Sequence, residues 1–590
     1  MSDTYRPFRN IETVDDLLLV RHACEGSPCL VQLPQQPYYA EICAWVNVQC
    51  PEETLFSSTE QVLLCTANEG DGDWRLVLTP HGYLRFEGTV ADERVECVSP
   101  VPASAVVDAK QQFRLGVSFV SYAWLQRNTA HWSEAASYSR IRLLASPGPS
   151  APLSEIGGIS GQKIPARLAP VPRGVHVGAM ADGSQPFNGQ ITELIAYNTS
   201  LSALFDGGAF RGAGQVLPVI PGGGAFEPRW VEERTIEAFP RPEFTQTASY
   251  WVFLRIADST HRLRRLRVRP VWRGGTNMTP TFFWSEDGDR WRRIVPHRVW
   301  MGEDGEDFRV EFELTERMAT NGFLASAPVF GEEQRLQLLR WAAEQEHTTV
   351  EQIGESVQGR PIHAIRVGMK QDGPDTKGVV VICGQHSPLE MMAAHVIEPV
   401  IRRLLWQPEL LESCTFCFVP TVNVDCAHYG GNGMNANGLN TNRQWFEDIQ
   451  PENAAVINYL DGLTAKGQSI EFAMDIHAGG TFKNHVLMTM GSSEVCQVGE
   501  EAQARQEQWA SLLEGHAGLR QEDGWPLAQQ RLRATDYFHQ THGATAFCLE
   551  MSSCSYFDPQ TQRTKGFDMM AFDLLADGLV SAWQEGFYQP

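Results

Sequence analysis

The chain has 590 residues, too many for one hydrophobic core, which predicts roughly three or four domains. Its 43% hydrophobic and 20% charged residues are typical of a soluble globular protein. The net charge of −23 argues against nucleic acid as a partner, because phosphate binding needs clustered Lys and Arg. No apolar stretch approaches the roughly 20 residues of a membrane-spanning helix, so we expect no membrane partner.

The N-terminal residues 1–16 are polar and acidic and lack the apolar core of a secretion signal. The thirteen cysteines are scattered, and the one pair with CxxC spacing, Cys414 and Cys417, lies within a strand-like run. This distribution is typical of reduced, mostly buried thiols. We therefore expect a cytoplasmic protein.

Residues 1–204 contain short runs of alternating apolar and polar residues, for example "AEICAWVNV", "YLRFEGTV" and "FRLGVSFV". These runs predict a β-sandwich domain. The stretch "PFNGQITELIAY" resembles the closing strands of concanavalin-A-like or laminin-G-like jelly rolls. The resemblance implies either a spacer or a domain that takes a protein or glycan ligand, and it identifies no site.

Residues 205–228 are dense in Gly and Pro and predict a linker or a draped loop. Residues 229–330 alternate again at a period of two, in "YWVFLRIA", "TFFWSEDG" and "FRVEFELTE", and predict a second β-sandwich. Within them "HRLRRLRVR" is locally basic. It could contact an acidic partner or form a solvated strand face.

Residues 331–590 have a different pattern. "EEQRLQLLRWAAEQEH" predicts an amphipathic helix, and apolar runs then alternate with helical segments: "HAIRVG", "GVVVICG", "TFCFVPTVN", "IEFAMDIHA" and "ATAFCLEMS". This alternation predicts an α/β domain with a mixed central sheet flanked by helices. Ligands of such sheets bind at the carboxyl ends of the strands.

Polar residues follow four of these apolar runs. They are His386 and Glu390, Asn423 and Asp425, Asp475 and His477, and Glu550. Two histidines and a carboxylate are the ligand set of a catalytic zinc, which keeps one position open for water. Each residue alone is typical of an ordinary loop or cap, whereas the four groups in this order indicate a metal site.

The same segments resemble motifs of the zinc carboxypeptidase superfamily, and of its cytosolic carboxypeptidase (deglutamylase) branch in particular. "GQHSPLE" resembles the first metal motif, "DIHAGG" the third-ligand motif and "ATAFCLEMSS" the strand of the general base. "PTVNVDCAHYGGNGMNANGLNTNRQW" resembles the substrate-binding stretch. The branch carries a β-sandwich before its catalytic domain, which agrees with the sandwich expected at 229–330.

This resemblance implies one zinc ion per chain, held by His386, Glu390 and His477. Asp425 would orient His386, because metal-bound imidazoles usually donate their other N–H to a carboxylate. Glu550 would take a proton from the attacking water and deliver it to the leaving amine.

On the substrate side, the resemblance implies that Arg443 and Asn442 bind the terminal carboxylate, for which a planar guanidinium is well shaped. Arg533 (or Arg531) matches a basic residue of the deglutamylase branch and would favour an acidic terminal side chain, unless the two arginines simply belong to a surface strand. Asp536 falls at a specificity position of the wider family and would favour a basic one. The two interpretations conflict.

The chain departs from the family pattern in the metal and substrate motifs. Three residues separate His386 from Glu390, where the usual motif has two, which weakens the assignment of Glu390. The usual Asp and Leu before the Asn-Arg pair are Asn440 and Thr441. The metal ligands and base look intact, while the substrate side looks altered.

An arginine that stabilises the oxyanion in the family is also missing, and Gly433 stands at its position. One such donor is typically worth about 3 kcal/mol. Asn432, Asn435 or Asn437 of the same Gly- and Asn-rich loop, or an Arg from elsewhere in the chain, could supply a donor in its place. We expect this loop to be mobile.

The leading functional prediction is a zinc metallocarboxypeptidase that hydrolyses C-terminal residues, acidic ones among them, from a peptide or protein with a free C-terminus. One alternative is a zinc amidase or deacylase acting on a small acylated amino acid. The other is a non-catalytic peptide- or glycan-binding protein with a vestigial peptidase domain. Metal analysis separates this last alternative from the two enzymes.

Overall fold

The structure is a computed structural model of the whole chain. The residues that it describes are 18–24, 28–33, 41–51, 54–55, 57–66, 74–90, 93–107, 112–120, 140–148, 154–160, 174–197, 205–206, 209–210, 216–218, 225–240, 251–256, 258, 262–268, 281–301, 308–369, 376–383, 390–429, 435, 437, 439–480, 485–489, 498–521, 533–552 and 555–588.

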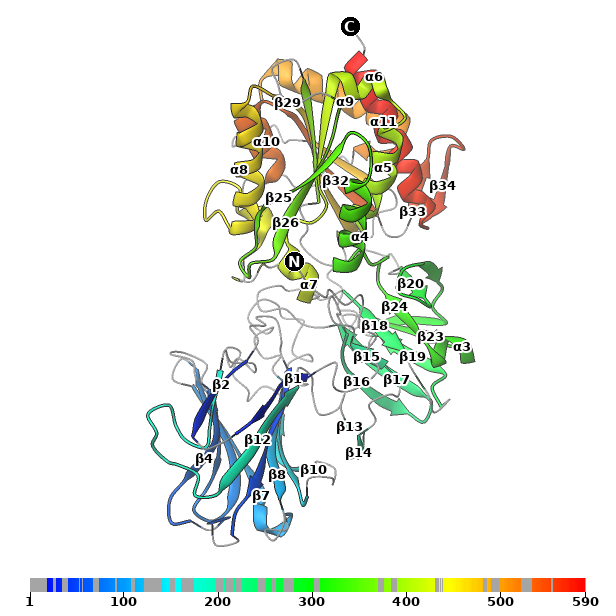
Figure 1. Cartoon of the computed structure of the whole chain (residues 1–590). Coiled ribbons are helices and arrows are strands. Elements are labelled where there is room, and N and C mark those ends of the chain that lie inside the picture. Colours follow the sequence, from blue (N-terminus) through cyan, green and yellow to red (C-terminus); the bar gives the residue numbers. More distant parts are fainter. Residues whose placement is uncertain are drawn as a thin grey trace.

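The N-terminal part of the chain consists of antiparallel strands (Figure 1). They are β1 (Leu18–Ala23), β2 (Cys29–Gln32), β3 (Glu41–Gln49), β4 (Gln61–Thr66), β5 (Trp74–Leu78), β6 (Tyr83–Val90), β7 (Glu93–Pro102), β8 (Phe113–Val120), β9 (Arg140–Ser146), β10 (Ser154–Ser160), β11 (Gly174–Val177) and β12 (Gln190–Tyr197). They form two six-stranded sheets, of order β1-β12-β3-β8-β9-β10 and β2-β11-β4-β5-β6-β7. Alternate apolar side chains from both sheets, such as Leu76, Phe86 and Val117, form one hydrophobic core. The predicted all-β character of this part is confirmed.

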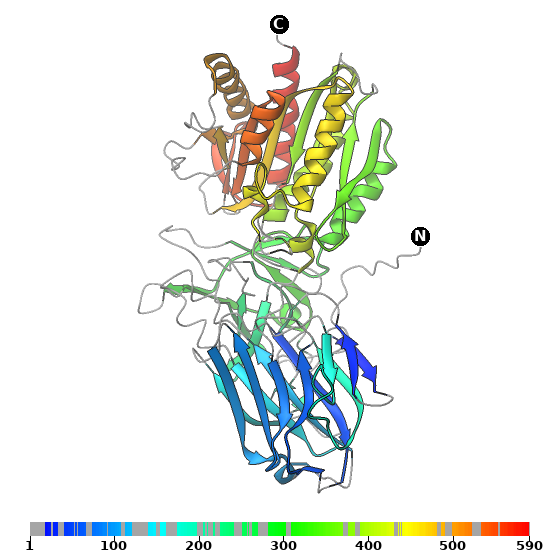
Figure 2. The same ribbon diagram turned by 90° about the vertical axis from the view of Figure 1, so that its left-hand side faces the viewer.

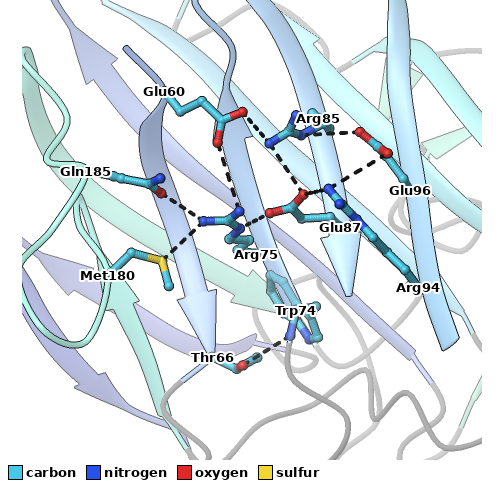
Figure 3. A network of polar contacts seen from close by, with 10 residues as sticks. All are labelled: Glu60, Thr66, Trp74, Arg75, Arg85, Glu87, Arg94, Glu96, Met180 and Gln185. Carbon is cyan, nitrogen blue, oxygen red and sulfur yellow. Dashed lines mark hydrogen bonds and ion pairs between the residues drawn. The ribbon is translucent and has the colours of Figure 1, made fainter. Parts of the chain in front are cut away.

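One face of the second sheet carries a network of ion pairs (Figure 3). Glu87 on β6 and Glu96 on β7 are register partners, and like charges directly opposite each other repel. Arg75, Arg85 and Arg94 surround Glu87, with Arg94 Nη2 2.6 Å and Arg85 Nη2 3.4 Å from its Oε2. The guanidinium groups compensate the carboxylates, so this face is charge-balanced.

A second group of strands follows. It comprises the short pair β13 (Phe205–Asp206) and β14 (Ala209–Phe210), then β15 (Val216–Pro218), β16 (Ala225–Glu232), β17 (Thr235–Pro240), β18 (Phe253–Ile256), β19 (Arg265–Val268), β20 (Phe282–Ser285), β21 (Arg292–Ile294), β22 (Arg298–Met301), β23 (Phe308–Glu313) and β24 (Gly322–Ala325). Beyond the pair β13-β14, these strands form two five-stranded sheets, β15-β18-β24-β20-β21 and β16-β17-β19-β23-β22.

The linker predicted at 205–228 is corrected by these strands. β15 pairs with β18, and β16 already begins at Ala225, so part of this segment belongs to the second group of sheets. β15 is the edge strand of its sheet. Proline has no backbone N–H to donate, and an edge strand tolerates Pro218 because one of its sides has no neighbouring strand. The Gly- and Pro-rich composition concealed these short edge strands.

The basic stretch "HRLRRLRVR" lies on β19 and the residues before it. Arg265 and Arg267 are register partners of Glu313 and Glu311 on β23. Arg267 Nη2 lies 3.0 Å from Glu311 Oε2 and 3.1 Å from Glu232 Oε1. The arginines of this strand are therefore paired with acidic residues within the fold.

The C-terminal part contains an eight-stranded mixed sheet. Its strands are β25 (Thr348–Glu355), β26 (Pro361–Val367), β27 (Lys377–Ile382), β28 (Cys414–Val419), β29 (Ser469–Gly480), β30 (Val486–Thr489), β31 (Arg520–Gln521) and β32 (Thr545–Ser552), in the order β25-β26-β28-β27-β29-β32-β30-β31. β28, β27, β29 and β32 are mutually parallel. This confirms the predicted mixed sheet.

Helices cover both faces of this sheet (Figure 2). They include α4 (Glu332–Ala343), α5 (Ile397–Leu404), α8 (Pro451–Ala465), α9 (Glu500–Ala517), α10 (Ala534–His542) and α11 (Met570–Tyr588). Apolar residues of α4, α5, α9 and α11 pack against one face, and those of α8 and α10 pack against the other. The first of these cores continues into the second group of sheets, where Phe283 on β20 contacts Phe567 with ring centroids 5.8 Å apart.

The carboxyl ends of the four parallel strands meet at one edge of the mixed sheet. The chain passes from β27 to β28 on one side and later to β29 on the other, so β27 marks the point where the strand order reverses. Ligands of α/β sheets bind at such a reversal point. This edge is directed toward the two groups of β-sheets (Figures 1 and 2).

Candidate active site

Two of the three predicted metal ligands meet at this edge. Glu390 begins the 3-10 helix η6 (Glu390–Val396), which follows β27, and His477 lies near the end of β29. β27 and β29 are hydrogen-bonded neighbours, so residues 87 positions apart come together. The Glu390 side chain is 7% exposed and that of His477 1%, and His477 Nδ1 lies 2.8 Å from Glu390 Oε2.

Asp475 supports His477 from the same strand. The two residues are two positions apart on β29, so their side chains project from the same face. Asp475 Oδ2 lies 2.8 Å from His477 Nε2, and the Asn442 amide nitrogen lies 3.2 Å from the same Nε2. Each ring nitrogen of His477 therefore faces a carboxylate, Nε2 that of Asp475 and Nδ1 that of Glu390.

The electrostatics of His477 follow from these two carboxylates. Burial alone would lower the pKa of His477, but Asp475 and Glu390 outweigh it and hold this pKa well above its usual range. The two carboxylates therefore surround the His477 ring with negative charge.

Asp475 had no predicted role beyond its place at a strand end. The signal that could have found it is its spacing from His477. A carboxylate two residues before a ligand histidine on the same strand shares the face of that histidine and can reach its outer nitrogen.

Glu550 lies beside the metal pair. It is the register partner of His477 on the adjacent parallel strand β32, so both side chains point to the same side of the sheet. Burial raises the pKa of Glu550 to about 7, the positive charge of His477 acts against this rise, and Glu390 adds to it. A carboxyl group that titrates near neutrality is well suited to accept and return a proton.

The donor chemistry fits zinc. A buried imidazole nitrogen and a buried carboxylate oxygen face each other, and both are donors that zinc prefers. Among the described residues, no group of three or more His, Cys, Asp or Glu side chains could hold a metal ion. His386, the third predicted ligand, lies outside the described residues.

The predicted carboxylate clamp lies next to this pair on the 3-10 turn η7 (Thr441–Arg443). The side-chain oxygen of Asn440 accepts the Asn442 backbone N–H at 3.0 Å and so caps the turn. Asn442 is buried against His477, and Arg443 is partly exposed. An asparagine at position 440 therefore still organises the turn, although the family pattern has an aspartate there.

The two conflicting specificity residues have different surroundings. The positive charge of Arg533 lowers the pKa of Glu550. Asp536 Oδ2 accepts the Arg533 backbone N–H at 3.0 Å and caps the first turn of α10. Arg531 lies outside the described residues.

Asp425 is a fully buried carboxylate that holds a turn between β25 and β26. Its Oδ1 accepts hydrogen bonds from Ser356 Oγ at 2.8 Å and Arg360 Nη1 at 2.7 Å, and its Oδ2 accepts the Gln358 backbone N–H at 3.1 Å. Both carboxylate oxygens therefore serve this turn. The predicted contact with His386 involves a residue outside the described segments.

Two residues of the asparagine-rich loop, Asn435 and Asn437, are described by the structure. Asn435 is buried, and its amide nitrogen donates to Gln450 Oε1 at 3.0 Å. The Asn437 amide nitrogen donates to the same oxygen at 2.9 Å. Both amides therefore donate to Gln450, a contact within the fold. Gly433 and Asn432 lie outside the described residues.

Comparison with known proteins identifies the class of this domain. Residues 336–587 match the family model described as zinc carboxypeptidase. The C-terminal part of the chain is therefore a zinc carboxypeptidase domain, and the family implies a zinc cofactor and a peptide substrate.

Solved structures with a similar fold are described as carboxypeptidases. A metallo-carboxypeptidase from Burkholderia cenocepacia is 17% identical, with a TM-score of 0.51, and the match covers 63% of this chain and 98% of that one. A candidate carboxypeptidase A from Shewanella denitrificans is 19% identical, with a TM-score of 0.52, over 62% of this chain and 97% of that one. The similarity is one of fold, and its share of this chain is larger than the segment that matches the family model.

Among curated proteins, an uncharacterised protein of Zymomonas mobilis is 25% identical over 198 residues, or 33% of this chain. The match spans about half of that relative, 48% of its length. None of the helices in the described part of the chain is long and apolar enough to cross a membrane.

Proposed function

We propose that this protein is a zinc-dependent metallocarboxypeptidase that removes residues from the free C-terminus of a peptide or protein. The observation that carries the proposal is the 2.8 Å contact between His477 Nδ1 and Glu390 Oε2, beside Glu550, in a zinc carboxypeptidase domain. His386, Glu390 and His477 would hold one zinc ion. When bound, zinc supplies a Lewis acid that polarises the scissile carbonyl and makes water more acidic.

The protein's own side chains would perform the remaining tasks. Glu550 accepts a proton from the attacking water and returns it to the leaving amine, a use that its pKa near neutrality supports. Asp475 would accept the Nε2–H of His477 and so orient its ring toward the metal. Arg443 and Asn442 bind the terminal carboxylate of the substrate, and this binding would limit the enzyme to free C-termini.

For specificity, we favour an acidic terminal side chain. The positive charge of Arg533 lowers the pKa of Glu550, which supports a role for this arginine near the base. The Asp536 carboxylate is already used as a helix cap, which makes it a poorer candidate for recognition of a basic side chain. This preference would place the protein near the deglutamylase branch.

The β-rich parts of the chain also belong to the proposal. We propose a concanavalin-A- or laminin-G-like sandwich at 1–204, and a second sandwich that precedes the catalytic domain and ends near residue 330. The shared core that contains Phe283 and Phe567 supports joint folding of this second sandwich with the catalytic domain. The first sandwich has a core of its own and could take a protein or glycan ligand.

Digestion of a peptide library, followed by mass spectrometry, tests this function. Stepwise loss of C-terminal residues by the zinc-loaded protein, abolished by a chelator and by Glu550→Gln, is the expected result. Peptides with an amidated C-terminus are the matched control, because they remove the carboxylate that Arg443 would bind. Cleavage of amidated and free peptides at equal rates would reject the carboxypeptidase assignment. Hydrolysis of acylated amino acids alone would favour the amidase alternative.

A further inference from the structure

The N-terminal sheets contain a pair of thiols in contact. Cys24 directly follows β1, and Cys29 begins β2. The two sulfur atoms lie 3.8 Å apart, with Cys29 Sγ placed to donate to Cys24 Sγ. Cys24 is 4% exposed, whereas Cys29 is partly exposed. Both are free thiols in this structure.

The two cysteines lie at the edge strands of the two N-terminal sheets. β1 is the edge strand of one six-stranded sheet, and β2 is the edge strand of the other. The Cys24 backbone N–H donates to the Thr192 carbonyl on β12, and Cys29 is the register partner of Val177 on β11. The two sulfur atoms therefore meet where the chain crosses from one sheet to the other, at the same open edge.

We propose that Cys24 and Cys29 are an oxidation site that forms a reversible disulfide and fastens the two sheets at this edge. The oxidant is a low-molecular-weight disulfide such as glutathione disulfide. The partly exposed Cys29 thiolate attacks one sulfur of glutathione disulfide, forms a mixed disulfide and releases one glutathione. Cys24 then attacks the Cys29 sulfur and releases the second glutathione, so that two thiols are oxidised and one disulfide is reduced.

The order of the two steps follows from burial. Burial, and then the neighbouring Cys29, raise the pKa of Cys24 to about 12, so Cys24 is a poor first nucleophile. Its sulfur is nevertheless already in contact with Cys29, which favours the intramolecular second step once the mixed disulfide exists. The proposal concerns a different part of the chain from the zinc site and does not depend on the peptidase function.

The experiment uses the full-length protein, equilibrated in buffers with increasing ratios of glutathione disulfide to glutathione. Free thiols are then trapped by alkylation, and cysteine-containing peptides are mapped by mass spectrometry. We expect a Cys24–Cys29 disulfide in the wild type. Cys24→Ser should instead accumulate a glutathione adduct on Cys29, because the resolving thiol is missing. Cys29→Ser should leave Cys24 unmodified, and Cys43→Ser, a buried cysteine elsewhere, should behave like the wild type.

Hydrogen exchange provides a second readout. Oxidation should slow exchange at the amides of β1 and β2 by about tenfold or more, because both edges must then open together. It should leave the catalytic rate unchanged. The proposal is overturned if both thiols stay alkylatable in the most oxidising buffer, or if the wild type stops at the glutathione adduct of Cys29. It also fails if the disulfide forms but exchange at both strands is unaffected.

Discussion

His477 and Glu550 are register partners on the adjacent parallel strands β29 and β32. The sheet therefore fixes the distance between the proposed metal ligand and the proposed base, independently of any loop. The two side chains lie on different strands, so either His477 or Glu550 can be replaced while the other remains in place. This arrangement makes the metal-binding and proton-transfer roles separable by mutation.

Glu550→Gln should bind zinc and fold like the wild type but lose about 10²- to 10⁴-fold in kcat, the usual contribution of general acid–base catalysis. The amide keeps the size of the side chain but cannot accept the proton. Steady-state kinetics, together with metal content and circular dichroism, measure the three properties. Turnover close to that of the wild type would mean that Glu550 is not the base.

Asp475→Ala should weaken zinc binding by about 10- to 100-fold, as expected when a carboxylate that orients a ligand histidine is removed. Asp475→Asn should lose less, because its side-chain oxygen can still accept the Nε2–H of His477. Competition with a chromophoric chelator measures the affinity. Asp461→Ala, an exposed aspartate on α8, is the control. Equal zinc affinity in the Asp475→Ala and Asp461→Ala variants would contradict the role.

Arg533→Ala should lower kcat/KM for peptides that end in glutamate by about 10- to 100-fold, the value of a hydrogen bond to a charged group. Peptides with an apolar terminal residue should be affected much less. Asp536→Asn should leave this preference intact, because its carboxylate caps α10. If Asp536→Asn instead abolished cleavage of peptides that end in lysine, the basic preference would be correct.

Arg360→Ala should reduce the free energy of unfolding by about 2 kcal/mol. Removal of one partner of a fully buried ion pair destabilises a protein by more than this value. The smaller effect is expected because Arg360 is 23% exposed and Asp425 keeps hydrogen bonds from two other donors. Arg290→Ala removes a well-formed but exposed pair with Asp287 and should leave the midpoint of urea denaturation almost unchanged. Equal midpoints of urea denaturation for the two variants would contradict the structural role of Asp425.

The sequence predicted the strands of the active site well, because their patterns are unambiguous. Buried parallel strands produce continuous apolar runs such as "GVVVICG" and "IEFAMDIHA", and both correspond to strands of the mixed sheet. The residues after these runs are brought together by topology alone. For this reason Glu390, His477 and Glu550 could be proposed together from sequence.

Contacts between side chains were harder to predict. The role of Asp475 could not be predicted without the orientation of the His477 ring, whose Nε2 faces Asp475 on the same strand. The binding of Asn435 and Asn437 to Gln450 depends on the path of a loop with several glycines, which has no periodic signature. The edge strand Val216–Pro218 lay within a Gly- and Pro-rich segment, where composition indicates a linker.

The central claim is that the edge of the mixed sheet around His477 and Glu390 holds one zinc ion. Elemental analysis of zinc in the purified wild type and in His477→Ala, with circular dichroism to verify folding, tests it most directly. We predict about one zinc per chain in the wild type and almost none in the folded variant. Equal zinc content in the two proteins, or none in the wild type after incubation with the metal, would contradict the claim.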